Sequence, residues 1–231
     1  MIDGNFRRTL VATSACLAAA GAWAGRPLNT ETADVVDAGV VQLEGYASRV
    51  TSGGTPTARG WNLQLSGGVG YRTQLAIAAS HAHADDTSAA GLLLGGKTWL
   101  VELGDDHPGV ALAYGLTQAR PSGDSWRQDT RYLTAVGTQP FGKLLVHANL
   151  GWTRSALAHQ TTTSWALATE YAAADKLSLA AETFGDDHGK PTVSVGALWQ
   201  AARRISVNSS YGVTFDHPRA RQWTLGFLLD L

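Results

Sequence analysis

The feature that most constrains the fold is an alternation of apolar and polar side chains from Val40 to the C-terminus, in segments of about ten residues. Successive side chains of a strand point to opposite faces, so a period of two residues is typical of strands. The last segment shows it clearly: Trp223, Leu225 and Phe227 alternate with smaller or polar residues. The alternation therefore predicts an all-β fold.

Twelve such segments follow one another, separated by turn residues. Membrane-crossing strands of bacterial barrels have about 9–11 residues, and short turns on one side of such barrels face longer loops on the other. Every second connection here is tight, as at 70–72, and the others are polar and mostly longer, as at 52–58 and 84–90. The pattern predicts one antiparallel transmembrane β-barrel with short periplasmic turns and somewhat longer extracellular loops. The expected strands are 38–51, 59–70, 73–83, 91–103, 109–120, 128–138, 143–154, 162–173, 176–185, 190–201, 204–215 and 220–231.

The second face of each strand indicates which environment the apolar face meets. That face carries Gly, Ala, Ser, Asn and Gln, and charged residues make up only 16% of the chain, against about 25% in soluble proteins. This favours a polar lumen inside and lipid outside. A soluble periplasmic barrel that binds a ligand is the alternative. Aromatic residues near strand ends on the apolar face, where interfacial girdles lie, are Trp152, Trp165, Tyr171, Trp199, Tyr211, Phe215 and Trp223.

The N-terminus has the three parts of a secretory signal peptide. Arg7 and Arg8 precede an apolar stretch at 9–20, which is followed by Ala22-Trp23-Ala24. Cleavage after Ala24 would remove the chain's only Cys and only Met, so the mature protein would hold no disulfide. The expected destination is the bacterial outer membrane. The predicted division is a signal peptide at 1–24, a periplasmic N-terminal segment at 25–37 and the barrel at 38–231.

The polar face supplies the candidate site residues. Charge inside a barrel needs water or a partner, so Lys97 and Arg131 are expected to form an ionic network with acidic residues across the lumen. No catalytic residue, metal ligand or cofactor is predicted. The expected lumen residues are Glu44, Tyr46, Asn62, Gln64, Lys97, Arg131, His147, Asn149, Glu170, Glu182 and Asp230.

The expected start of the mature chain carries a family resemblance. It contains Arg26-Pro27-Leu28, then Asp37-Ala38-Gly39, then Val41-Gln42-Leu43-Glu44. In this spacing it resembles a family of bacterial outer-membrane transporters of the phenol meta-degradation-pathway type. The resemblance implies a channel for the passive passage of small molecules, including aromatic or other hydrophobic compounds, and it brings no catalytic residue.

Two groups of partners follow from the predicted location. The final strand, Trp223–Leu231, resembles the terminal strand that the barrel-assembly machinery recognises, although it ends in Leu instead of Phe or Trp. Outer-membrane lipid and lipopolysaccharide would surround the wall, and Asp86 and Asp187 could hold cations that bridge lipopolysaccharide phosphates. Nucleic acid is not expected, because 18 basic residues against 19 acidic ones give a net charge of −1 without a basic cluster.

An outer-membrane lipid hydrolase is the enzymatic alternative. It would need a serine within hydrogen-bond reach of a histidine, and His147 and Ser155 are the candidates. His147 is expected on the lumen face, where a polar network is the preferred interpretation. The two motifs Asp105-Asp106-His107 and Asp186-Asp187-His188 are expected on opposite sides of the membrane, too far apart for one metal site.

Overall fold

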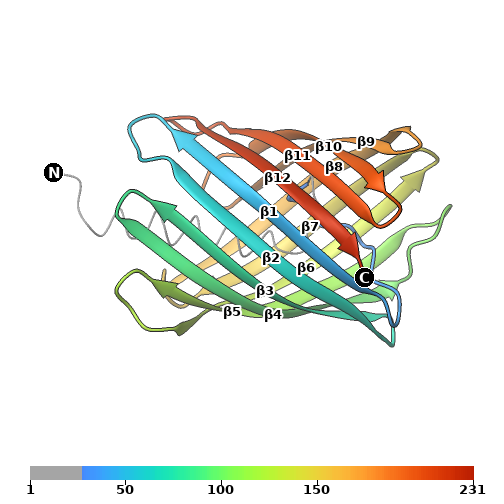
Figure 1. The fold of residues 1–231 in the computed structure, drawn as a ribbon, viewed down its shortest axis with the longest axis horizontal. Helices are drawn as coiled ribbons and strands as arrows, with labels where there is room; N and C mark the ends of the chain where they lie inside the picture. The colour runs from blue at the N-terminus through green and yellow to red at the C-terminus, as the bar shows by residue number, and fades with distance from the viewer. Residues whose placement is uncertain (1–27) are drawn as a thin grey trace.

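The computed structural model describes residues 28–231, which form a closed barrel of twelve strands (Figure 1). Neighbours in the chain pair antiparallel, and β12 pairs with β1 to close the sheet. Closure leaves no unpaired strand edge, as a sheet in lipid requires. The predicted fold class is confirmed. The strands are β1 (Val41–Ser52), β2 (Ala58–Gly70), β3 (Thr73–Ala84), β4 (Thr87–Val101), β5 (Gly109–Pro121), β6 (Arg127–Phe141), β7 (Leu144–Ser155), β8 (Gln160–Ala174), β9 (Leu177–Asp186), β10 (Thr192–Ala202), β11 (Ile205–Thr214) and β12 (Ala220–Asp230).

The barrel has two rims with different connections. We call the rim where β1 begins and β12 ends the terminal rim, at the right of Figure 1, and the opposite one the loop rim. Most connections at the terminal rim have two residues, but 102–108 is longer than expected. At the loop rim, the expected loop at 84–90 is only a tight turn at Asp85 and Asp86. Asp85 has φ 48°, the left-handed conformation that two-residue hairpin turns require.

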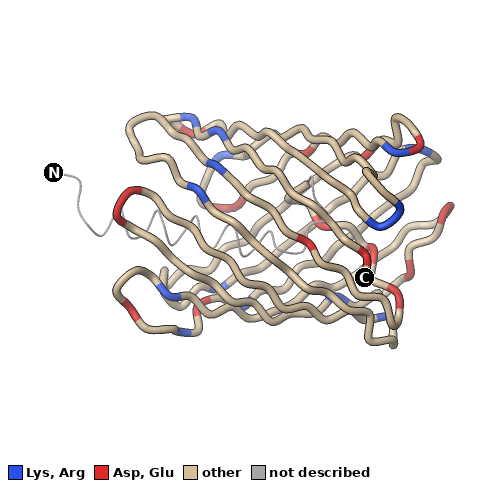
Figure 2. The backbone as a smooth tube through the Cα atoms, in the orientation of Figure 1, with Lys and Arg blue, Asp and Glu red and all other residues tan. Residues whose placement is uncertain are grey.

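The apolar face of the strands points outward. In β2, Trp61 and Leu63 are 48% and 43% exposed, whereas Asn62 between them is 5% exposed. All seven aromatic residues expected on this face have exposed side chains. Figure 2 shows that charged positions gather toward the rims, so that the middle of the outer wall is largely free of them. Within residues 28–231, no helix has the length and apolar character to cross a membrane.

Residues 28–40, which we call the lumen segment, run inside the barrel before β1 begins. Leu28, Thr30 and Ala33 are at most 1% exposed. The sequence predicts a periplasmic N-terminal segment at 25–37, separate from the barrel at 38–231, whereas the described part of that segment, 28–37, lies inside the barrel. The physical reason lies in the polar lumen, whose side chains bind the backbone of this segment. The predicted signal peptide, 1–24, lies outside the described residues.

The turn from the lumen segment into β1 is fixed at the terminal rim. Gly39 N–H donates to Gly68 O over 3.0 Å, and Gly68 N–H donates to Val40 O over 3.0 Å. Gly39 has φ 83°, a conformation open to glycine at little cost. A Cβ atom on Gly68 would lie 2.0 Å from Asp37 O. Glycine at position 68 therefore lets the segment pass closely over β2.

Candidate functional site

Glu182 of β9 holds the beginning of the lumen segment. One carboxylate oxygen accepts hydrogen bonds from Thr30 N and Thr30 Oγ1, each over 2.8 Å. The backbone N–H of Asn29 donates to both oxygens, over 2.8 and 3.0 Å, and its side-chain amide donates over 2.9 Å. Hydrogen bonds to a carboxylate are about twice as strong as neutral ones. Glu182 is therefore the strongest single attachment of the segment to the wall.

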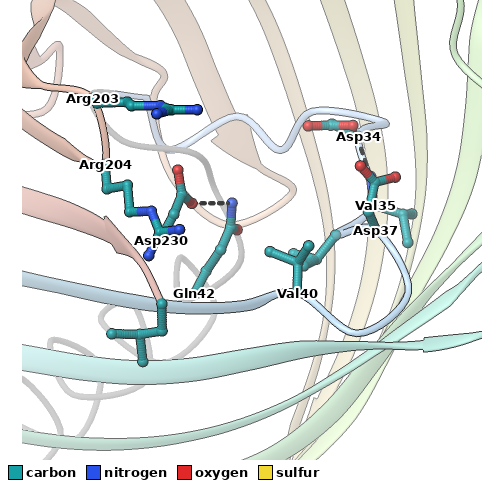
Figure 3. Close-up of a pocket in the computed structure, with 10 residues that line it drawn as sticks. Asp34, Val35, Asp37, Val40, Gln42, Arg203, Arg204 and Asp230 are labelled. Carbon is teal, nitrogen blue, oxygen red and sulfur yellow. Dashed lines mark hydrogen bonds between the residues drawn. The ribbon is translucent and has the colours of Figure 1, made fainter.

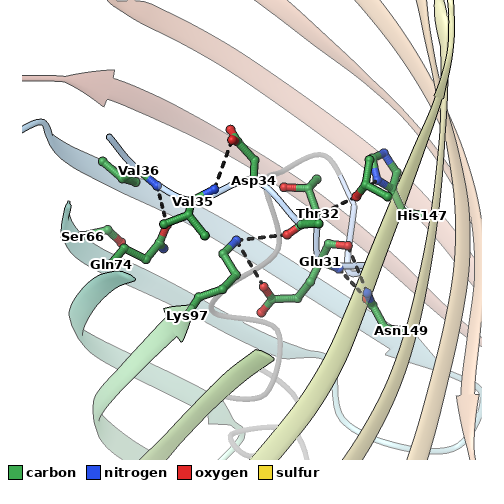
Figure 4. A network of polar contacts seen from close by, with 12 residues as sticks. Glu31, Thr32, Asp34, Val35, Val36, Ser66, Gln74, Lys97, His147 and Asn149 are labelled. Atoms are coloured by element: carbon green, nitrogen blue, oxygen red, sulfur yellow. Dashed lines mark hydrogen bonds and ion pairs between the residues drawn. The ribbon is translucent and has the colours of Figure 1, made fainter. Parts of the chain in front are cut away.

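Lys97 of β4 makes the second charged attachment (Figure 4). Its Nζ donates to Thr32 O over 3.1 Å and lies 3.7 Å from Glu31 Oε2. The neighbouring inward residue of β4, Trp99, donates from Nε1 to Ala33 O. Three consecutive residues of the segment are thus tied to one strand of the barrel.

Neutral side chains of three further strands complete the attachment. Asn149 of β7 accepts from Glu31 N over 2.6 Å and donates to Glu31 O over 3.1 Å. Thr138 of β6 accepts from Ala33 N over 2.8 Å, and Gln74 of β3 accepts from Val36 N over 2.8 Å. Every side-chain attachment lies on β3 to β9, and the backbone hydrogen bonds with Gly68 add β2 at the terminal rim, so the segment lines one side of the lumen.

The other side of the terminal rim is open. A cavity of about 390 Å³ lies there between the lumen segment and the ends of β1, β11 and β12 (Figure 3). Asp34 and Asp37 line it from the segment, and Arg203 and Arg204 line it from the turn before β11. Its polar, charged lining suits water and dissolved ions.

The lumen segment carries two acids with perturbed protonation. Burial raises the pKa of Glu31 to about 7, although the nearby Lys97 ammonium opposes the rise. Burial also raises the pKa of Asp34, again against the charge of Lys97. Desolvation outweighs the cation in both cases because burial penalises the charged carboxylate.

Ten of the eleven expected lumen residues lie on the inward face of their strands, judged by the alternation of burial along each strand. Lys97, Asn149 and Glu182 contact the lumen segment directly. His147 lies behind it, with Nδ1 2.9 Å from Thr138 Oγ1. Asp230 accepts from Gln42 Nε2 over 3.0 Å. The remaining inward residues of the set are Glu44, Tyr46, Asn62, Gln64 and Glu170.

Arg131 is the exception, and its expected lumen position is wrong. Its neighbour Tyr132 is the inward residue, 8% exposed, while Arg131 is exposed on the outer wall beside Arg154. In outer-membrane barrels the outer face near a rim lies at the level of lipid headgroups and carries polar residues, so polarity near a rim does not indicate the lumen. The expected ionic network also differs, because the ion pair of Lys97 is with Glu31 of the lumen segment.

The residues of the lumen segment that bind the barrel wall are not predicted by the sequence. Glu31 and Thr30 lie in a short stretch without strand periodicity, and such a stretch gives no signal of where it packs. The sequence carries one indication of such a segment, which is the number of polar residues predicted to face inward. Glu182 and Asn149 are examples, and the strands of the wall offer them no obvious partner.

The structure does not bring the hydrolase candidates together. His147 contacts Thr138, whereas Ser155 lies eight positions further along β7 and donates to Asp129 Oδ1 over 2.6 Å. At about 3.3 Å per residue, the two are about 26 Å apart, far beyond hydrogen-bond reach.

The two acidic motifs lie at opposite rims, as expected. The first lies in the connection after β4 at the terminal rim, and the second follows β9 at the loop rim. In the second, the side-chain oxygens and nitrogen of Asp186, Asp187 and His188 lie within 4.8 Å of one another. Both carboxylates accept backbone hydrogen bonds, from Gly189 N and Thr163 N among others. These bonds account for the clustering by ordering the turn.

A family model described as "Uncharacterised conserved protein UCP029691" matches residues 9–217. No curated protein sequence matches the chain. Among solved structures, an outer-membrane channel from Pseudomonas putida F1 is similar, with a TM-score of 0.66 and 12% identity over 86% of this chain and 97% of that one.

Two porins are also similar to this chain. The KdgM porin in complex with disordered oligogalacturonate has a TM-score of 0.61 and 7% identity, over 81% of this chain and 98% of that one. The NanC porin has a TM-score of 0.55 and 10% identity, over 82% of this chain and 100% of that one. At these identities the likeness establishes the fold, which is that of outer-membrane barrels.

Proposed function

We propose that this chain, which belongs to the family described as "Uncharacterised conserved protein UCP029691", is a bacterial outer-membrane channel for small molecules, narrowed by its own N-terminal segment. The observation that carries the proposal is the lumen segment, attached to β3–β9 and leaving an open polar cavity of about 390 Å³ beside it. A polar cavity inside a barrel with an apolar outer face suits the entry of dissolved solutes. The similar structures whose titles name channels and porins support the same role.

The outer wall and the chain ends support the location. Exposed side chains such as Leu150 and Ile77, 62% and 57% exposed, would be unfavourable in water over such a wide surface and favourable in lipid. We place the terminal rim in the periplasm, because β1 begins and β12 ends there and outer-membrane barrels have their short turns on that side. An export signal at 1–24 and recognition of Trp223–Leu231 by the assembly machinery belong to the same proposal.

The charges of the inner face indicate the kind of solute. Glu170 and Asp230 are acidic and face inward, whereas Lys97 is already paired with Glu31. The inner wall therefore carries an excess of negative charge, and such a lumen concentrates cations. Small polar or cationic solutes are favoured over anions.

Small aromatic or hydrophobic solutes are the second candidate. The resemblance of 26–44 to transporters of the phenol meta-degradation-pathway type implies them, and that resemblance stays a prediction. Catalysis has less support than either kind of passage, since His147 and Ser155 lie far apart.

Planar-bilayer recording tests the proposal. Purified protein should give discrete conductance steps in potassium chloride, and a salt gradient should give a reversal potential of the sign that cation preference requires. Membrane fractionation with a heat-modifiability gel checks the location and the folded barrel. Recovery in the soluble fraction, or a folded protein that stays silent in bilayers, would overturn the channel. Uptake of phenol into liposomes, without ion preference, would favour the second candidate.

A further inference from the structure

Two pairs of arginines face outward near the loop rim. Arg49 of β1 lies directly opposite Arg59 of β2, and Arg131 of β6 lies directly opposite Arg154 of β7. All four side chains are exposed. The two pairs are five strands apart in the twelve-stranded barrel, so the same arrangement occurs independently on two sides of the wall.

Each pair is unfavourable without an anion. Directly opposite side chains have Cβ atoms about 4.5–5.5 Å apart, and like charges at that spacing repel each other. Within residues 28–231, none of the four arginines has a carboxylate within 4.0 Å. An arginine facing lipid is also costly unless it reaches the headgroups. The compensating negative charge must therefore come from the surroundings of the barrel.

Neighbouring aromatic residues fix the depth of the pairs in the membrane. Arg49 lies directly opposite Trp223, and Arg59 is two positions from Trp61 on the same face. In the second pair, Arg154 is two positions from Trp152. Tryptophan girdles lie at the interface between hydrocarbon and headgroups. The guanidinium groups, level with these rings or on their rim side, therefore reach the lipid phosphates.

The chemistry of each pair suits a phosphate group. A guanidinium presents its N–H groups as a planar fork that binds two phosphate oxygens at once. Two forks side by side can bind opposite edges of one phosphate. Beside the first pair, His83 of β3 lies directly opposite Arg59, which adds a third possible donor. In the second pair, Thr161 of β8 lies directly opposite Arg154 and offers a hydroxyl.

We propose that the pairs Arg49–Arg59 and Arg131–Arg154 are binding sites for the phosphate groups of lipopolysaccharide on the outer wall of the barrel. The phosphorylated glucosamines of lipid A lie in the leaflet that the loop rim would face. The inference rests on the outer-membrane location and orientation proposed above, and it does not depend on conduction.

Binding of lipid A to the purified protein in neutral detergent tests the sites, with native mass spectrometry as the readout. Bisphosphorylated lipid A should bind at least about tenfold more tightly than dephosphorylated lipid A, since each lost charge-assisted contact costs about a factor of ten or more. This comparison uses the unaltered protein and so does not depend on the folding of a variant. Equal affinity for the two lipids would overturn the proposal.

Variants then locate the sites. The double variants R49Q/R59Q and R131Q/R154Q should each lose one bound lipid A, and the combined variant should lose both. The matched control is K143Q/K176Q, which removes two exposed cations from the terminal rim and should bind like the unaltered protein. An equal loss in the control would mean that net charge, not the pairs, attracts the lipid. Heat modifiability verifies that each variant is a folded barrel.

Two further measurements distinguish lipid A binding from binding of free phosphate and from the proposed conduction. Millimolar inorganic phosphate should not displace lipid A; full displacement would indicate a site for the free ion and overturn the lipid assignment. Conductance is recorded in phosphatidylcholine bilayers that hold no lipopolysaccharide. A silent protein that still binds lipid A through the arginines would overturn the channel alone, whereas a conducting protein indifferent to lipid A phosphates would overturn only the binding sites.

Discussion

Lys97 Nζ lies 3.7 Å from Glu31 Oε2, and the two side chains are 5% and 8% exposed. The pair joins the wall of the barrel to a segment that precedes it in the chain. The backbone N–H and C=O of Glu31 also make two hydrogen bonds with the side-chain amide of Asn149. Glu31 therefore joins the lumen segment to β4 and β7 together, next to the attachment that Glu182 makes to Asn29 and Thr30.

Release of the lumen segment, which would open the channel, should depend on pH through Glu31. Its pKa is raised from 4.5 to about 7 when the segment is attached, so the attached state binds more protons than the released state between these values. The attachment is then fully favourable below about pH 4.5 and weakens as the pH rises to about 7, by about 3 kcal/mol in all. Single-channel conductance should show longer or larger openings at pH 8 than at pH 5.

The variant Glu31→Gln is the control for this pH dependence. Glutamine keeps the size of the side chain and does not titrate, so openings between pH 5 and pH 8 should become nearly constant. Asp34 titrates in the same direction and leaves a smaller residual slope. A full pH response in the Glu31→Gln protein would show that another group controls the segment.

Of the side chains that hold the lumen segment, Glu182 should be the one whose substitution releases the segment most. Glu182→Gln keeps the shape but removes the charge that accepts the N–H groups of Asn29 and Thr30. Hydrogen bonds to charged groups contribute about 1.5–3 kcal/mol each, so a net loss of about 2 kcal/mol should raise the released fraction roughly thirtyfold. Labelling of a cysteine at position 33, which is buried at 0% exposure in the attached segment, measures that fraction.

Glu170→Gln is the matched control for Glu182→Gln. Glu170 faces inward from β8, half-buried, and makes no hydrogen bond or ion pair with the described residues of the lumen segment. Labelling at position 33 should stay at the level of the otherwise unaltered protein. If both variants release the segment equally, the effect comes from the charge of the lumen and not from the hydrogen bonds of Glu182.

The barrel could be predicted from the sequence because its wall has a strict period of two. Trp61, Asn62 and Leu63 show how each residue type follows the environment of its face, lipid or lumen. The rule holds in the middle of the wall and fails near the loop rim. Arg131 lies there on the outer face, where outer-membrane barrels carry polar residues at the level of lipid headgroups, and so its polarity alone predicts the wrong side.

The lumen segment could not be predicted, because its position follows from tertiary hydrogen bonds and not from periodicity. Thr30 and Ala33 are held through backbone N–H groups, which every non-proline residue carries. No side-chain pattern therefore distinguishes a segment inside the barrel from one in the periplasm. The inward acceptors Glu182 and Thr138 were visible, but their partners were not.

Removing residues 28–36 should widen the channel. The segment fills one side of the lumen toward the terminal rim. Water can replace its polar contacts with β3–β9, and its apolar contacts are few, made by Leu28 and Ala33 with mostly small side chains of the wall. The deletion should raise the single-channel conductance severalfold and abolish the pH dependence attributed to Glu31, while the heat-modifiability shift persists. Unchanged conductance in a folded deletion variant would show that the passage is limited elsewhere.

Gly68→Ala should displace the lumen segment from the terminal rim without a large effect on the barrel. The added Cβ atom would lie 2.0 Å from Asp37 O and 2.3 Å from Val36 O, and both are backbone atoms that cannot move away as a flexible side chain would. Conductance should therefore rise toward that of the deletion variant. Gly67→Ala is the matched control, since the nearest atom to its Cβ would be 3.9 Å away, an ordinary contact distance. A closed Gly68→Ala channel, or an equal opening of Gly67→Ala, would mean that the close approach of the segment to β2 does not hold it in place.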